Sequence, residues 1–301
     1  MALKCDVQYG KGSSGFKLTK VGVSGVRKPV MISRPGLTSP LNSVVSCTFD
    51  IYVDLPASQR GSHLSRNVEV LRAVADETVS KPISGIENLA VEMVEKLLVK
   101  HEYAANAYVN VVADYYKANK TPSGRDTLEL YKIHAGAHGV RDGEIRKMIG
   151  VEVVGMTACP CAQETVGELL NVENPGFPMM SHNQRNVVTI TLTTDKSQNI
   201  EVDDLISLAE KSVSTPTFEL LKREDEGKVV INAHSNTRFV EDVVRNGLTL
   251  VTHNYKDLPD DVEVKVVSDS EESIHKHNAY AERTATLGEL REELAQNIPA
   301  L

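Results

Sequence analysis

The stretch GMTACPCAQ, Gly155–Gln163, is the part of this sequence from which its fold and chemistry are best worked out. It follows an alternating apolar pattern that predicts a strand over residues 149–157, and it places two cysteines on either side of one proline. The stretch SHNQR, Ser181–Arg185, comes next and precedes a second predicted strand. A thiolate and an imidazole are good ligands for Zn(II) or Fe(II). Together the two stretches favour a metal-assisted enzyme.

The elements around these stretches predict an α+β protein. In the second half we expect strands over 149–157, 187–194, 262–266 and 278–287. We expect a helical region that begins at 203, is interrupted near 215–216 and resumes to 221. A further helix should begin at 239 and end at Asn246-Gly247. In the first half we expect a strand over 44–55, helices over 65–76 and from a capping box at 84–87, and strands over 103–116 and 127–134. Residues 1–42 are rich in Gly, Ser, Pro and Lys and are expected to wrap a domain. The order predicts two tandem modules, residues 1–146 with an extended N-terminal segment and residues 147–301 with the metal-ligand motifs.

Composition sets the broad class. The 301 residues are 41% hydrophobic and 25% charged, as in a globular protein that can bury a core. A net charge of −8 and a pI near 5.6 argue against a nucleic-acid or anionic-membrane surface. There is no signal-peptide pattern at the N-terminus and no apolar run long enough to cross a bilayer. Only four cysteines are present, so a reducing cytoplasm is the expected setting.

Each candidate site residue also has a purely structural explanation. Cys159 and Cys161 are equally well explained as two small buried hydrophobes, although their place between a strand and a polar segment favours a functional loop. A lone histidine such as His182 is usually solvated or hydrogen-bonded, but here it is followed by Arg185, which is suited to a phosphate or carboxylate. The acidic stretch Arg223–Gly227 is by itself typical of a solvated helix end with a glycine stop.

Two further patterns stand out. Glu241 lies beside an apolar stripe, where a carboxylate is either half-exposed or paired with a ligand, such as a guanidine-like purine edge with two adjacent N–H donors. Glu272 and His275 are three residues apart and can converge, although a polar turn explains them equally well. In the first half, His63 and Arg66 open a helix whose backbone N–H groups suit phosphate oxygens, and a plain N-cap by Ser62 is an equally good local explanation.

The order of these motifs resembles one family. The segments that carry the resemblance are Lys20–Val30, Gly61–Arg66, Gly155–Gln163, His182–Arg185, Phe239–Asp242 and Glu272–His275. Together they resemble the type IB GTP cyclohydrolases, and the wording of Met156–Gln163 is similar to the archaeal branch. The resemblance covers roughly residues 18–285.

The resemblance implies a tunnelling fold (T-fold), in which each subunit carries two ββααββ-like modules. It implies that subunits pair to close a barrel, as a homodimer or a homotetramer, with active sites at subunit interfaces. Much of the sheet would then be completed by a partner, which accounts for a chain with 5% aromatic residues and no Trp.

The resemblance also implies roles for individual residues. The metal ligands would be Cys159, His182 and Glu226, where Glu224 departs from the proline that the family has at this position. The catalytic set would be Cys159, Glu272 and His275. Glu241 would anchor the guanine edge, and the substrate-binding candidates from the local patterns are His63, Arg66 and Arg185.

The chemistry implied is hydrolytic opening of the guanine imidazole ring of GTP. A divalent metal, with Fe(II) preferred and Mn(II) or Zn(II) as alternatives, lowers the pKa of bound water, which attacks C8 while His275 or Glu272 handles protons. Formate and pyrophosphate leave, and the product is 7,8-dihydroneopterin 2',3'-cyclic phosphate, in a first step of pterin biosynthesis.

Three alternatives stay open. The bacterial-type reaction on the same scaffold gives 7,8-dihydroneopterin triphosphate. A T-fold nitrile reductase would use a cysteine nucleophile and NADPH without a metal. A non-catalytic module would bind zinc through Cys159 and Cys161 and turn over no GTP.

Overall fold

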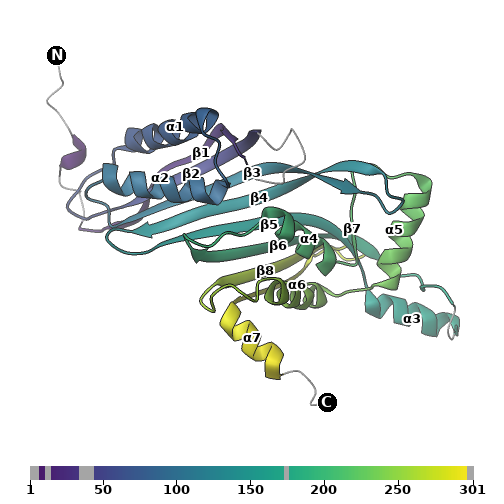
Figure 1. The fold of residues 1–301 in the computed structure, drawn as a ribbon. Helices are drawn as coiled ribbons and strands as arrows, with labels where there is room; N and C mark the ends of the chain where they lie inside the picture. Colours follow the sequence, from purple (N-terminus) through teal and green to yellow (C-terminus); the bar gives the residue numbers. More distant parts are fainter. Residues whose placement is uncertain (1–6, 11–14, 34–43, 173–175, 297–301) are drawn as a thin grey trace. The chain divides into compact units, whose positions relative to one another are not determined.

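The computed structural model describes residues 7–10, 15–33, 44–172 and 176–296. Its strands follow one antiparallel order, β1-β2-β3-β4-β5-β6-β8-β9, and β7 pairs with β5 (Figure 1). The strands are β1 (Leu18–Met31), β2 (Val44–Leu55), β3 (Asn106–Lys120), β4 (Asp126–Val140), β5 (Ile145–Ala158), β6 (Asn183–Asp195), β7 (Thr215–Pro216), β8 (Glu263–Glu271) and β9 (Ala279–Thr286). The helices are α1 (Leu64–Ser80), α2 (Ile86–Lys100), α3 (Pro160–Leu170), α4 (Val202–Ser212), α5 (Arg223–Ser235), α6 (Val240–Asn254) and α7 (Leu287–Gln296).

The chain divides into two compact units. The first contains residues 1–115, 133–149 and 194–198, and the second contains residues 116–132, 150–193 and 199–301. The proposed tandem division of the sequence after residue 146 stays a prediction, because it concerns a repeat of element order rather than these units.

In the first unit, α1 and α2 cover one face of the sheet (Figure 1). Side chains of β2 alternate between this face and the opposite one, so that Phe49, Ile51 and Val53 are completely buried. Helix α2 buries an apolar stripe that includes Leu89 and Met93, both fully inaccessible. The period of two in the strand and the helical period of the stripe therefore form the core of this unit.

In the second unit, α6 packs against β8 and α4 packs against α6. The strands contribute Ile190 and Val266 to the core, and α4 contributes Leu205 and Ile206, all of them with no exposed surface. The alternation along β6 and β8 places their apolar side chains on the helix-covered face. Strands β5 and β6, whose ends carry the motifs described above, directly precede β8 in the strand order.

Several local expectations are corrected by the structure. Residues 18–31 form strand β1, which pairs with β2, although the segment 1–42 was expected only to wrap a domain. The N-cap of α2 is Gly85 without a side-chain bond, so a capping box does not start this helix. Residues 217–221 are not helical, and a helix that the sequence did not predict, α5, begins at Arg223. Helix α7 was also not predicted.

Two glycines expected to stop helices lie inside them. Gly227 is in α5, with nothing within 4 Å of the position its Cβ would take. Gly247 is in α6, where a Cβ would come within 2.9 Å of Cγ1 of Val266 on β8. Gly247 therefore serves the close approach of helix and strand instead of ending the helix.

None of the helices in the described ranges is long and apolar enough to cross a membrane.

Candidate active site

Strand β5 leads directly into the cysteine stretch. Cys159 is the N-cap of α3, with extended backbone angles, and Pro160 is the first helical residue, where its missing N–H costs nothing. Cys159 is half-buried, whereas Cys161 on the helix is exposed. The sequence Cys-Pro-Cys thus turns the chain from strand to helix and separates the environments of the two thiols.

Backbone hydrogen bonds join Cys159 to the segment before β6. The N–H of Cys159 donates to the carbonyl oxygen of His182 over 3.1 Å. The hydroxyl of Ser181 donates to the carbonyl oxygen of Cys159 over 2.6 Å. The structure therefore brings together the cysteine and the histidine that the sequence predicts as metal ligands.

The ring of His182 is oriented by a neighbouring amide. Its Nδ1 lies 3.0 Å from Oε1 of Gln184, whose amide nitrogen donates to the hydroxyl of Thr157 over 3.3 Å. Because Oε1 can only accept, Nδ1 of His182 carries the hydrogen and donates. Nε2 is then the nitrogen with a lone pair. A histidine that binds a metal characteristically donates its other ring N–H to such an acceptor, so His182 fits this role.

The loop between β8 and β9 brings a carboxylate to the same histidine. Oε2 of Glu272 lies 3.7 Å from Nδ1 of His182, and the two side chains are only 8% and 12% exposed. Oε2 is buried and has no hydrogen-bond partner in the described part of the chain. A buried carboxylate oxygen requires a partner, so this one suits a ligand, a proton or a substrate atom.

His275 lies in the same loop and completes the group. Its ring centroid is 6.2 Å from that of His182, edge to face, and 5.2 Å from that of His277, with which it stacks. Cys159, His182, Glu272 and His275 are therefore gathered at the ends of β5, β6 and β8. His277 is an additional histidine that the sequence did not single out.

Gln163 and His234 hold the segment that precedes His182. The amide nitrogen of Gln163 donates to the carbonyl oxygens of Met179 (2.9 Å) and His234 (2.7 Å). Nε2 of His234, on α5, lies 3.2 Å from the carbonyl oxygen of Ser181. These bonds fix the approach to His182 from α3 on one side and α5 on the other.

Glu226, the predicted third ligand, is an exposed residue of the first turn of α5. Its neighbour Asp225 is completely buried and accepts hydrogen bonds from the N–H groups of Ser123 and Lys222. The bonds from Ser123 hold the pKa of Asp225 below its usual value. Among the described residues no three His, Cys, Asp or Glu side chains form a group that could hold a metal, so the assignment of Glu226 stays a prediction.

Two predicted substrate residues of the second unit lie at the surface. Glu241 is exposed in the first turn of α6, where Asp242 accepts a hydrogen bond from the N–H of the N-cap Phe239. Arg185 is exposed on β6 and lines a cavity of about 340 Å³ together with Glu129 and other residues of β4, β5 and the segment after β7. Both side chains are accessible to a ligand in solution.

His63 and Arg66 belong to the first unit. His63, and not Ser62, is the N-cap of α1, and no side-chain bond caps the helix. Ser62 instead shares a 2.8 Å hydrogen bond with the hydroxyl of Tyr103. Nη1 of Arg66 donates to the carbonyl oxygen of Lys100 over 2.9 Å, which ties the start of α1 to the end of α2.

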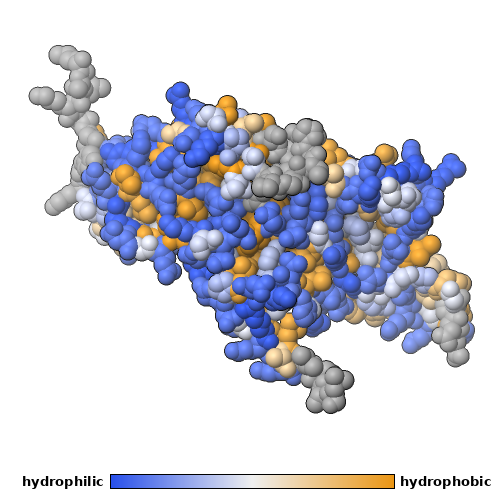
Figure 2. All heavy atoms as spheres, viewed as in Figure 1, coloured by the Kyte–Doolittle hydropathy of each residue, from blue (hydrophilic) through white to orange (hydrophobic). Residues whose placement is uncertain are grey.

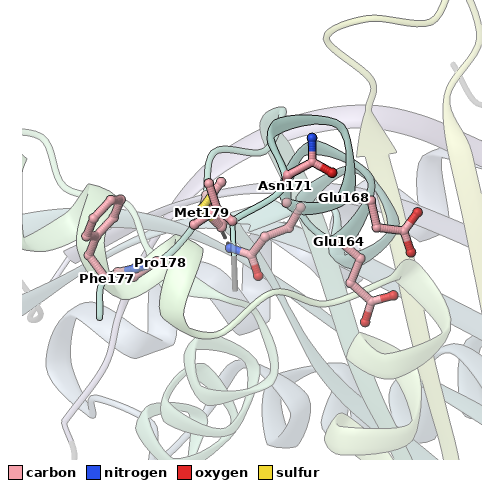
Figure 3. A pocket seen from close by; sticks show the side chains of 9 residues that line it. Glu164, Glu168, Asn171, Phe177, Pro178 and Met179 are labelled. Carbon is pink, nitrogen blue, oxygen red and sulfur yellow. Dashed lines mark hydrogen bonds between the residues drawn. The ribbon is translucent and has the colours of Figure 1, made fainter. Parts of the chain in front are cut away.

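A larger cavity of about 980 Å³ lies between α3 and the loop 177–179 (Figure 3). Glu164 and Glu168 project from α3, and Phe177 lies on the opposite side of this helix, beyond Met179 (Figure 3). Cys159 and His182 are not among the residues that line it. The cavity is therefore separate from the cysteine and histidine group, although Gln163 contributes to both.

The sequence comparisons give the family. The family model described as "Type I GTP cyclohydrolase folE2" matches residues 5–281. The chain belongs to this family. It is 43% identical over 315 residues to GTP cyclohydrolase MptA of Methanothermobacter thermautotrophicus and 42% identical over 311 residues to GTP cyclohydrolase MptA 1 of Methanocella arvoryzae, and in both comparisons 98% of each chain is covered. The predicted resemblance and the enzyme class, GTP cyclohydrolase, are thereby confirmed.

One solved structure confirms the fold of this folE2 family member. A hyper-thermostable AgUricase mutant matches with a TM-score of 0.51 and 8% identity, over 89% of this chain and 91% of that chain. At this identity the likeness shows the architecture alone. It supports the predicted α+β tunnelling fold.

Sequence patterns missed some residues of this folE2 site. Gln163 and Gln184 lie inside the two quoted stretches, so their position was a usable signal. His234 lies in a helix with few buried residues, which left no periodic signal. Gln163 and His234 bind distant carbonyl oxygens and Gln184 binds the distant hydroxyl of Thr157, and only the folded chain brings these partners near.

Proposed function

We propose that this GTP cyclohydrolase is metal-dependent and converts GTP to 7,8-dihydroneopterin 2',3'-cyclic phosphate, formate and pyrophosphate. The observation that carries the metal dependence is the orientation of His182, whose Nδ1 is occupied by Gln184 and whose Nε2 is left with a lone pair. The relatives named MptA support the archaeal form of the reaction.

The donor set suits a borderline-soft divalent cation. Cys159 offers sulfur, His182 offers nitrogen and Glu226 offers carboxylate oxygen, a set that leaves one position open for water. We propose Fe(II) as the metal, with Mn(II) or Zn(II) as alternatives. When bound, the cation supplies a water that is nucleophilic at neutral pH.

The residues of the chain orient the base and move protons. Glu241 accepts hydrogen bonds from the two N–H donors of the guanine edge, which directs C8 of the ring to the site. A proton leaves the attacking water and one is delivered to the ring nitrogen released when the bond to C8 breaks, with His275 or Glu272 as the general acid/base. Arg185, His63 and Arg66 neutralise the phosphate oxygens.

The test is anaerobic incubation of the purified chain with GTP and each metal. Formate should be released with Fe(II), be abolished by a chelator and return when Fe(II) is added back. Mass spectrometry of the product separates the cyclic phosphate from the triphosphate. Turnover that persists after complete removal of metal, or consumption of NADPH with a nitrile substrate, would contradict the proposal.

The partners follow from the fold. We propose that the chain assembles into a homodimer or homotetramer that completes the active site. Exposed apolar side chains at the α3 end of the second unit support such an assembly (Figure 2), among them Leu169, Leu170, Phe177 and Met180.

A further inference from the structure

The segment between α5 and α6 is bound to the residue that precedes Cys159. Ala158 is completely buried, and its N–H donates to the hydroxyl of Ser214 over 3.3 Å. Its carbonyl oxygen accepts the N–H of Arg238 over 3.0 Å. Both backbone groups of Ala158 are thus fixed by segments that lie far along the sequence.

The side chain of Arg238 anchors the same segment to α4. Its Nη1 donates to the carbonyl oxygens of Lys211 (2.9 Å) and Ser212 (2.5 Å), at the end of that helix, and its Nε donates to Oδ1 of Asn236 (3.3 Å). A guanidinium is well suited to this place, because the last carbonyls of a helix lack partners and carry partial negative charge.

Arg238 stands three residues before Glu241 and is separated from α6 only by the N-cap Phe239. Its backbone is joined to the start of the Cys159 turn, and its side chain is joined to α4. We propose that Arg238 is a positioning residue that sets the place of Glu241 relative to Cys159. This inference rests on the proposed function, in which Glu241 anchors the guanine and Cys159 holds the metal.

The experiment compares Arg238→Lys and Arg238→Ala with the wild-type enzyme loaded with Fe(II). Loss of the fork of hydrogen bonds should raise the KM for GTP about tenfold or more in Arg238→Ala, with a smaller rise in Arg238→Lys. Bound metal per chain should not change, since neither variant removes a ligand. Arg245→Ala is the matched control, because Arg245 lies on α6 with Glu241 and its guanidinium makes an exposed ion pair with Asp242, which contributes little to stability. It should keep the wild-type KM.

A double variant tests whether Arg238 acts through Glu241. In a Glu241→Ala background, Arg238→Lys should add little further loss of GTP affinity, because the anchor that it positions is gone. An unchanged KM with a lower melting temperature in the Arg238 variants would show that Arg238 has a merely structural role. Loss of bound metal would show that the substitution acts on the metal ligands instead of on Glu241. Either result overturns the inference. Calorimetry of GTP binding compares the same variants without turnover. It therefore distinguishes a failure of this inference from a failure of the proposed reaction.

Discussion

At the scale of single residues, Gln184 determines what His182 can do. By accepting the hydrogen of Nδ1, it leaves Nε2 as the nitrogen that would bind the proposed metal, and its own amide is oriented by Thr157. Removing such an outer partner typically weakens metal binding by 10- to 100-fold. The same residue is invisible to a search for ligand types, because an amide is a poor ligand for iron or zinc.

We therefore expect Gln184→Leu to bind Fe(II) about 10- to 100-fold more weakly and to recover GTP turnover when Fe(II) is raised. Cys159→Ala and His182→Ala should lose metal and turnover together, and added metal should not restore them. Cys161→Ala is the control, because that thiol is exposed. Metal titration with formate release measures all four variants. Normal metal content in Cys159→Ala would refute the site.

A second residue-scale prediction concerns pH. His101 has no exposed surface, and burial lowers its pKa from 6.5 to about 4, with Arg66, His63 and Lys100 adding repulsion. Between these values the unfolded chain binds a proton that the folded chain does not. Stability is therefore full above pH 6.5 and falls by about 3 kcal/mol as the pH drops towards 4.

Denaturant unfolding between pH 4 and 7 measures this effect. His101→Gln should flatten the slope relative to the wild type. Tyr103→Phe removes the 2.8 Å hydrogen bond to Nδ1 of His101 but keeps the imidazole, so this variant should retain the wild-type slope of stability against pH. Equal slopes in the wild type and His101→Gln would show that His101 is not the group responsible.

At the scale of elements, regular apolar patterns predicted the core strands and helices. The elements that were missed have irregular patterns. Strand β2 was predicted over its observed bounds, Val44–Leu55, because every second residue is apolar. Helix α5 was missed since only Asp225, Val229 and Ala233 are buried in it, which is too little for an apolar stripe. Strand β1 was missed because its glycines, proline and lysines interrupt the alternation of apolar and polar residues.

The site shows the same division. The motifs singled out Cys159 and His182, and a backbone hydrogen bond joins the two residues, while their role as metal ligands stays a prediction. His234 and Arg238 could not be predicted, because their side chains bind mainly to carbonyl oxygens, which any sequence provides. Residues that bind the backbone leave no pattern in the sequence of their partners.

The two misassigned glycines give a matched prediction for helices. Gly227→Ala should stabilise the protein by about 0.5–1 kcal/mol, since alanine is the better helix former and the added methyl meets nothing. Gly247→Ala should destabilise it by about 1–2 kcal/mol, because its Cβ would crowd Val266. Thermal or denaturant unfolding compares the two. A stabilising Gly247→Ala would show that α6 can move away from β8.

At the scale of the whole molecule, the exposed position of Glu226 gains meaning from assembly. If the metal centre takes Glu226 from a partner subunit, two inactive variants can complement each other. Mixing Cys159→Ala with Glu226→Ala under conditions that exchange subunits should restore part of the formate release. Light scattering should give a multiple of the 32.9 kDa chain. If activity does not return in verified mixed oligomers, Glu226 either belongs to the metal centre of its own chain or is not a metal ligand.

The contrast among the thiols provides a chemical reporter. Cys47 is completely buried, and burial raises its pKa to about 12, so it stays the unreactive thiol at neutral pH. Cys159 and Cys161 share one short peptide but differ in exposure. Alkylation followed by peptide mapping can therefore report on the proposed metal site. We expect the modification of Cys159, relative to that of Cys161, to decrease as the cation is titrated in. Occupancy could then be followed in native protein, without turnover.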